Sequence, residues 1–189
     1  MMGAVKTMLQ AILDAFSAIL GPVWQDHPLV TLWVMLLLAP VNMASFGFVW
    51  DWLGIFSSIM FMVALGPNLL MLVKYKGIIR LMGAPHLVGW IPLEVAIGLR
   101  LGTDAFGVDK ATWDDDRALF TWAIIIGVVD GISIIFDAVD TYRWYSGSDT
   151  EVIMAKNTRA RLGLPAEGPI TAEQAVAAGQ KADNHGVDV

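Results

Sequence analysis

The sequence has no cysteine and few charged residues, and both shortages exclude classes of protein. Without thiols the chain can form neither a disulfide framework nor a zinc finger held by cysteines. Lys and Arg number 12 against 18 Asp and Glu. Because phosphate binding needs a basic surplus, this balance argues against a nucleic-acid partner. Only 16% of the residues are charged and 56% are hydrophobic, with a mean hydropathy of +0.61, which predicts a membrane protein.

Sequence signatures of catalysis are also missing. The chain contains no Walker loop, no GxSxG, no HExxH, and no GxGxxG that opens a helix after a strand. No part of it has the composition of a soluble catalytic domain. We therefore expect that the protein is not an enzyme, and an enzymatic function stays open as the less favoured alternative.

Long apolar runs predict four membrane-spanning helices. A helix rises about 1.5 Å per residue, so about 20 apolar residues cross a hydrocarbon core that is roughly 30 Å thick. Four stretches of the sequence meet this length, at about 29–50, 52–73, 81–101 and 118–141. The single acid Asp51 separates the first two, so their turn is expected around residues 48–54. The predicted fold class is an all-α integral membrane protein with a four-helix transmembrane bundle, in a domain of residues 23–145.

Short helices are expected on both sides of this domain. In residues 1–22 the apolar side chains share one helical face, which predicts an amphipathic helix in the membrane interface or, equally, one packed on the spans. Residues 146–189 are predicted to form a cytoplasmic tail with two short helices. Ser148 with Glu151, and Thr171 with Gln174, fit capping boxes at the starts of these helices.

Positively charged residues predict the orientation of the spans. The loop between the second and third spans holds Lys74, Lys76 and Arg80, which places it on the cytoplasmic side. Both termini are then cytoplasmic, and we expect a multi-pass protein of the inner membrane. The acidic connection 104–116 lies outside, where the acids before Arg117 are expected to cap the last span.

Five polar residues inside the predicted spans are the candidate transport or proton site. They are Asn42, Asn68, His86, Glu94 and Asp130. An ionisable group in hydrocarbon costs about 2.5 to 3.5 kcal/mol on insertion scales, so each should face the protein interior and have a partner. Counting residues from the cytoplasmic end places Asn42 at the depth of Glu94, and the other three at a shallower depth. We therefore expect one pair of Asn42 with Glu94, and a second group of Asn68, His86 and Asp130.

Helical spacing places further polar residues on the same faces. In the fourth span Asp130, Ser133, Asp137 and Asp140 share one stripe, and Asp140 is expected to pair locally with Arg143. Three prolines lie beside polar residues of the spans, at positions 40, 67 and 92. Each indicates either a simple kink or one of the broken helices with which transporters build a binding pocket.

Three functions fit these features. The first is an accessory or scaffolding subunit of a larger membrane complex, which contacts lipid and other membrane subunits or further copies of itself. The second is a small oligomeric transporter or a proton- or cation-conducting protein that uses Glu94 and Asp130. The third is a pigment, haem or metal binder that uses His86, with Asp130 and Asp137 as further metal ligands. A histidine at a helix start that bonds to the backbone fits His86 as well. The sequence identifies no cofactor and no substrate.

Overall fold

The computed structural model describes residues 9–10, 12–14, 17–23, 28–104 and 106–184, and 76% of it is helical. Three helices are long and apolar enough to cross a membrane. They are α5 (Trp52–Tyr75), α6 (Gly83–Gly102) with the preceding 3₁₀ turn η4 (Arg80–Met82), and α7 (Arg117–Tyr145). These helices agree with the class of membrane protein that the composition predicts.

Of the predicted interfacial helix, residues 1–8, 11 and 15–16 lie outside the described residues, and a π-helical turn, η1 (Ile19–Val23), lies at its end.

The predicted span 29–50 is a run of short helices instead of one regular helix. The run consists of α3 (Pro28–Leu32), the π-helix η2 (Trp33–Leu38), α4 (Ala39–Met43) and the 3₁₀ helix η3 (Ala44–Phe48). Pro40 explains the irregular geometry, because it has no N–H to donate and its ring crowds the carbonyl of Leu36. The chain widens to a π turn immediately before this proline, where the Ala39 N–H donates to the carbonyl of Val34.

The chain divides into two compact units, and each has its own core. One unit comprises Leu32–Leu65 and Gly83–Val139, and we call it the span unit. The other comprises Met1–Thr31, Gly66–Met82 and Asp140–Val189, and we call it the tail unit. Because α5 and α7 each contribute residues to both, the units are defined by packing and do not follow the order of the chain.

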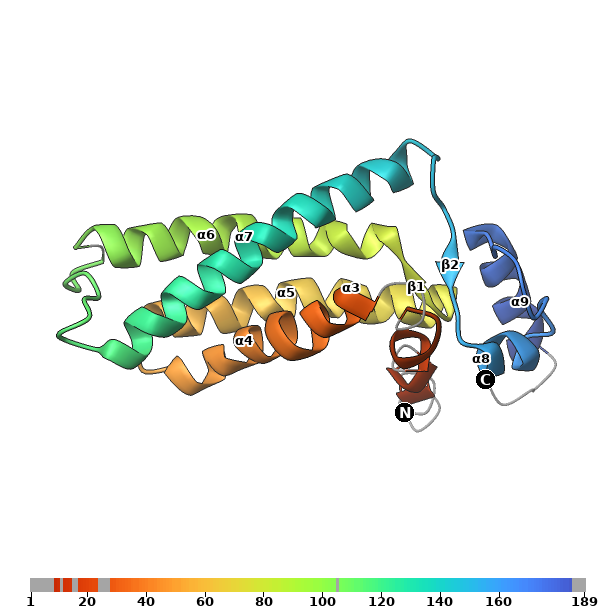
Figure 1. Ribbon diagram of the computed structural model, residues 1–189, viewed down its shortest axis with the longest axis horizontal. Coiled ribbons are helices and arrows are strands. Elements are labelled where there is room, and N and C mark those ends of the chain that lie inside the picture. The colour runs from red at the N-terminus through yellow and green to blue at the C-terminus, as the bar shows by residue number, and fades with distance from the viewer. Residues whose placement is uncertain (1–8, 11, 15–16, 24–27, 105, 185–189) are drawn as a thin grey trace. The chain divides into compact units, whose positions relative to one another are not determined.

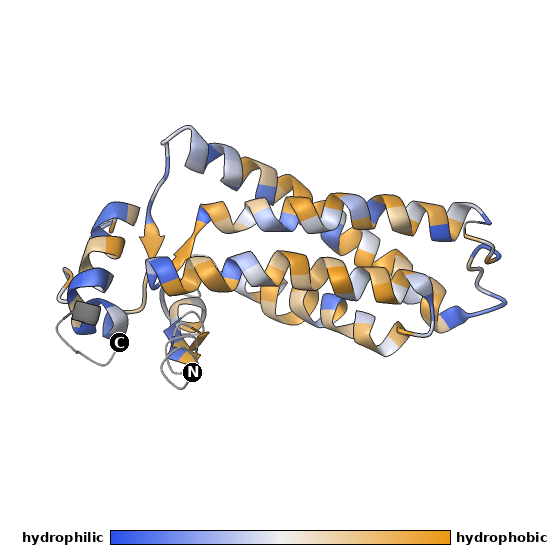
Figure 2. Cartoon of the chain, turned by 180° about the vertical axis from the view of Figure 1, so that it is seen from behind, coloured by the Kyte–Doolittle hydropathy of each residue, from blue (hydrophilic) through white to orange (hydrophobic). Residues whose placement is uncertain are grey.

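The span unit contains α4, the first part of α5, the whole of α6 and most of α7. These helices lie side by side (Figure 1). The core between them is apolar and is built around Leu53, Leu93, Leu119 and Ile126. Apolar residues occur all along these helices (Figure 2), and many of them are exposed, among them Ile59, Val88, Val95, Val128 and Ile135. Helices that are apolar on every side are typical of a membrane environment.

Local hydrogen bonds in the span unit explain where its helices begin. Asp51 accepts a bond from the N–H of Leu53 at 2.9 Å and so caps α5, which confirms the predicted turn at 48–54. A Cβ atom at Gly54 would lie 2.0 Å from the carbonyl oxygen of Phe48, so this turn requires glycine. Asp116 accepts from the N–H of Leu119 at 3.0 Å, which confirms the predicted cap of α7.

The tail unit contains a small antiparallel ribbon covered by helices. Strand β1 (Ile78–Ile79) pairs with β2 (Val152–Ile153), and Ile79 lies opposite Val152. The helices of this part of the tail are α8 (Lys156–Arg161) and α9 (Ala172–Asn184). An isolated two-stranded ribbon has little stability in water, so its apolar side chains depend on their contacts with the buried residues Met154, Ile170 and Ala175.

One of the two predicted capping boxes is present and the other is not. The N–H of Thr171 donates to Gln174 Oε1 at 2.9 Å, and the N–H of Gln174 donates to Thr171 Oγ1 at 3.3 Å, so the second box is confirmed. The prediction of a helix starting at Ser148 is wrong, because the chain turns and bends at 146–148 and then continues into β2, and the helix in this stretch, α8, begins at Lys156. Burial of the β-branched pair Val152–Ile153 against β1 outweighs the local capping signal.

Candidate functional site

A hydrogen bond between Asn42 and Asp130 lies in the middle of the span unit. Asp130 of α7 is 0% exposed and Asn42 of α4 is 1% exposed. The Nδ2 atom of Asn42 donates to Asp130 Oδ1 at 2.8 Å and to the carbonyl oxygen of Leu38 at 3.1 Å. The second bond fixes the amide on its own helix, beside Pro40. Asn42 therefore links the irregular helical run to α7 through a bond that strengthens when the carboxyl is charged.

Glu94 of α6 lies against small residues of α7 next to Asp130. A Cβ atom at Gly127 would lie 3.6 Å from Glu94 Oε2, and one at Gly131 would lie 3.7 Å from Oε1. Gly127 and Gly131 flank Asp130 on the helix surface, so the Glu94 carboxyl group lies on the part of α7 that carries Asp130. We call Asn42, Glu94 and Asp130 the polar layer.

Each residue of the polar layer keeps one oxygen atom without a hydrogen-bond partner among the described residues. These atoms are Asn42 Oδ1, Glu94 Oε1 and Asp130 Oδ2. Nor does any ion pair within the described part of the chain involve Glu94 or Asp130. Because more than about 90% of buried polar groups in proteins are hydrogen-bonded, three open acceptors at one place indicate capacity for a proton, a water molecule or a ligand.

Two tryptophans fasten the irregular helical run to α7 around the polar layer. Trp33 Nε1 donates to Ser133 Oγ at 3.0 Å, and Trp122 Nε1 donates to the carbonyl oxygen of Val41 at 3.1 Å. Sequence reasoning did not assign these two bonds. Two features of the sequence could have suggested them. A buried indole N–H needs a hydrogen-bond acceptor, and Ser133 lies on the same helical stripe as Asp130.

His86, near the start of α6, faces Asp137 of α7. Its Nδ1 atom lies 3.4 Å from Asp137 Oδ1, and its ring stacks on Trp90 with the two centroids 4.1 Å apart. Gly83 permits this approach, because a Cβ atom there would lie 2.8 Å from the carbonyl oxygen of Asp137. The residues described here include no group of three or more His, Asp or Glu side chains that could hold a metal ion. His86 thus belongs to an imidazole–carboxylate pair that can hold or pass a proton.

A buried ion pair between Arg100 and Asp51 lies at the other end of α6. The Nε and Nη2 atoms of Arg100 donate to Asp51 Oδ2 at 3.0 and 2.9 Å, and its Nη1 atom donates to the carbonyl oxygen of Asp109 at 2.6 Å. Sequence reasoning left this pair out of the candidate site. The signal was present, since Asp51 and Arg100 are charged residues at the ends of apolar runs and each needed a partner.

The pair of Asn42 with Glu94 predicted from depth is wrong, because the Asn42 amide bonds to Asp130. His86 faces Asp137, and the predicted group of Asn68, His86 and Asp130 stays a prediction, since Asn68 belongs to the tail unit. The depth count assumed regular α-helices with one rise per residue. The π and 3₁₀ turns around Pro40 have a different rise and rotation per residue, so they change which neighbour Asn42 meets.

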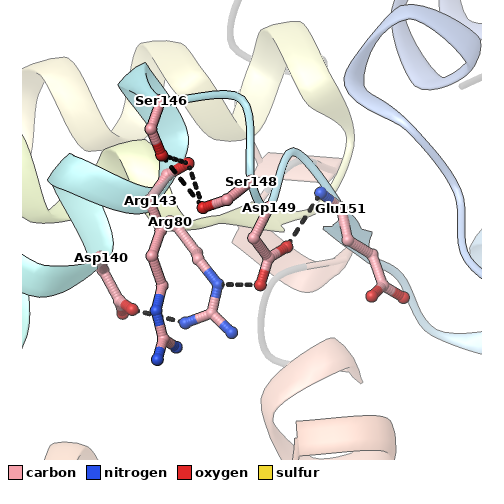
Figure 3. Close-up of polar contacts among 7 residues, drawn as sticks. All are labelled: Arg80, Asp140, Arg143, Ser146, Ser148, Asp149 and Glu151. Atoms are coloured by element: carbon pink, nitrogen blue, oxygen red, sulfur yellow. Dashed lines mark hydrogen bonds and ion pairs between the residues drawn. The ribbon is translucent and has the colours of Figure 1, made fainter.

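In the tail unit, Arg80 holds the end of α7 and the chain before β2. Its Nη1 atom bonds to Asp140 and its Nε atom bonds to Asp149 (Figure 3). Arg143 contributes its backbone carbonyl, which accepts bonds from the hydroxyl groups of Ser146 and Ser148. The structure thus pairs Asp140 with Arg80 in place of the predicted Arg143. A pair formed across 60 positions cannot be seen in local helical spacing.

Comparison of the chain with protein-family models, curated proteins and solved structures gives no match. The chemistry of the polar layer must therefore be inferred from its own residues. These provide two carboxyl groups and one amide in a buried position, with an imidazole–carboxylate pair on the same two helices, α6 and α7.

Proposed function

We propose that the chain is a small multi-pass membrane protein that conducts protons through Glu94 and Asp130. The observation that supports this function is the pair of carboxyl groups in the polar layer, each with an open oxygen and neither in an ion pair among the described residues. A charged carboxylate in hydrocarbon costs about 2.5 to 3.5 kcal/mol. In this proposal at least one of the two carboxyl groups holds a proton at rest, and transport consists of exchanging it.

The residues on one side of the polar layer support a path for protons. His86 and Asp137 form the group through which protons reach Asp130 from the cytoplasm. Asp137 and Asp130 are two turns apart on α7, about 10 Å along the helix, so water must bridge them. The Arg100–Asp51 pair lies at the outer end of α6 in this orientation and closes the path until it separates.

This proposal keeps the four-span arrangement. The irregular run of residues 28–48 is the first crossing and completes a four-helix bundle with α5, α6 and α7. Both termini lie in the cytoplasm of a cell with an inner membrane, because Lys74 lies in the last turn of α5, and Lys76 and Arg80 lie between α5 and α6. Broken helices beside a buried polar site are a feature of transporters, and the π turn before Pro40 has that position next to Asn42.

An accessory subunit of a membrane complex is the second candidate. A shallow groove on the span unit favours it, with a volume of about 510 Å³ and a lining that includes Phe46, Val49, Ile55, Ile59 and Met62. An apolar helix of another membrane subunit, or of a second copy, would fit such a surface. In this case Glu94 and Asp130 contribute to stability only.

The test is proton flux through the purified protein in liposomes. A potassium gradient with valinomycin sets the membrane potential, and a trapped pH dye reports proton movement. We expect flux with the wild type, and flux at the level of empty liposomes with Glu94→Gln. Glu173→Gln, the same change at an exposed position of α9, is the matched control and should conduct normally.

Several outcomes would decide against the proposal. Wild-type liposomes that behave as empty ones, or full flux with a folded Glu94→Gln variant, would contradict proton conduction. Stoichiometric partner proteins after gentle purification would then favour the accessory subunit. A chromophore or metal at one per chain would instead favour the remaining expectation, a pigment, haem or metal binder that uses His86.

A further inference from the structure

The three open oxygens of the polar layer have the chemistry of cation ligands. Two are carboxylate oxygens and one is an amide oxygen, and hard cations prefer such oxygen ligands. They come from α4, α6 and α7, so a bound ion would join three separate elements of the span unit. Both Asn42 and Asp130 are more than nine-tenths buried, which removes bulk water as the ordinary partner of their open atoms.

The residues that carry these oxygens are neighbours. The Asn42 amide donates to the Asp130 carboxyl group at 2.8 Å, so its oxygen belongs to a group in direct contact with that carboxyl group. Asp130 Oδ2 belongs to that carboxyl group. Glu94 Oε1 lies over Gly131, the residue that follows Asp130, and the absence of a side chain there leaves the space between α6 and α7 open to it.

We propose that Asn42, Glu94 and Asp130 form a binding site for a monovalent metal cation of the Na⁺ type, which competes with the proton. This inference rests on the proposed function, because it defines the ions that the conducting site accepts. Before the cation binds, both carboxyl groups are protonated in this proposal. When the cation enters, one carboxyl proton leaves to water, so the charge of the polar layer is unchanged. The other carboxyl group keeps its proton, and this limits repulsion between Glu94 and Asp130.

The neighbouring charges favour a monovalent ion. Asp137 lies two turns from Asp130 on α7 and faces His86 of α6, so a further acid and a base are close to the polar layer. A cation lowers the repulsion among these acids, whereas Ca²⁺ takes about six to eight oxygen ligands and the polar layer offers three open ones. The rest of the coordination shell of a small monovalent ion can be water.

Thermal unfolding of the full-length protein in nanodiscs tests the site, with NaCl, KCl and choline chloride compared at equal ionic strength. We expect Na⁺ to raise the Tm by roughly 5 °C at a hundredfold excess over its Kd, because it binds only the folded state. A pH indicator in weakly buffered solution should show one proton released for each Na⁺ bound. Equal Tm values in NaCl and choline chloride would overturn the proposal.

Variants separate this site from nonspecific salt effects. Asp130→Asn should lose the Na⁺-dependent shift, whereas Asp114→Asn, the same change at an exposed loop position, should keep it. Glu94 is only partly buried, so Glu94→Gln is the second variant if Asp130→Asn does not fold, and it should also lose the shift. A Na⁺ shift of wild-type size in a folded Asp130→Asn or Glu94→Gln variant would overturn the proposal.

The liposome assay distinguishes failure of this inference from failure of the proposed function. Proton flux that is the same in NaCl and choline chloride, with no Na⁺ shift in Tm, rejects the cation site and leaves proton conduction standing. A specific Na⁺ shift with no proton flux supports the cation site and rejects proton conduction.

Discussion

Asn42 and Asp130 are 88 positions apart in the sequence, and the amide of Asn42 donates to the Asp130 carboxyl group at 2.8 Å. Both side chains are buried. Removing either partner leaves the other buried without this bond, a loss that costs about 1 to 3 kcal/mol. The pair is therefore a structural link between α4 and α7 as well as part of the candidate site.

The first prediction concerns this pair. Asn42→Ala should lower the free energy of unfolding by about 1 to 3 kcal/mol, because Asp130 Oδ1 loses its donor. Denaturant unfolding in detergent micelles measures the change. In an Asp130→Ala background the same substitution should cost much less, and purely additive effects in this double-mutant cycle would contradict the link.

The second prediction concerns the Arg100–Asp51 ion pair. Arg100→Gln should destabilise the protein by about 3 to 5 kcal/mol, because it leaves the Asp51 carboxylate buried without its cation. Arg117→Gln, at an exposed position at the start of α7, is the matched control and should change stability by less than about 1 kcal/mol. Similar unfolding midpoints for both variants would show that the buried pair has no special role.

The third prediction compares two glycines of α6. A methyl group at Gly89 would lie 2.9 Å from the carbonyl oxygen of Met60 on α5, whereas one at Gly98 would meet nothing within 4 Å. Gly89→Ala should therefore cost about 1 to 3 kcal/mol through overpacking. Gly98→Ala should stabilise the helix by about 0.5 to 1 kcal/mol. Thermal unfolding of the two variants checks the sign, and an equal effect would mean that α5 and α6 do not approach closely.

The fourth prediction concerns Arg80 in the tail unit. Arg80→Gln removes the shared partner of Asp140 and Asp149, so the chain between α7 and β2 should be cleaved faster in limited proteolysis (Figure 3). Each of these partly exposed pairs contributes about 1 kcal/mol or less, so the global Tm should change little. Arg143→Gln keeps the backbone carbonyl that Ser146 and Ser148 use, and its cleavage rate should match that of the wild type.

Local features were the ones that sequence reasoning predicted correctly. The caps at Asp116 and Thr171 and the turn at Asp51 depend on hydrogen bonds between residues two or three positions apart. Apolar runs likewise located the three long helices, because the length needed to cross a membrane is set by the rise of a helix. The failed capping box at Ser148 shows the limit of such signals, since a distant strand supplied the stronger interaction.

The sequence by itself determined the class of the protein and included the residues of the polar layer among five candidates, because composition, helix length and the cost of buried charge are properties of single segments. Only the tertiary structure decided which polar residues meet. Asn42 bonds to Asp130, Arg100 to Asp51 and Arg80 to Asp140, each across 49 or more positions. Such pairs depend on how whole helices rotate and how closely they approach each other. Pro40 and the glycines at 83, 89, 127 and 131 affect this rotation and approach. The sequence of a single segment does not reveal the result.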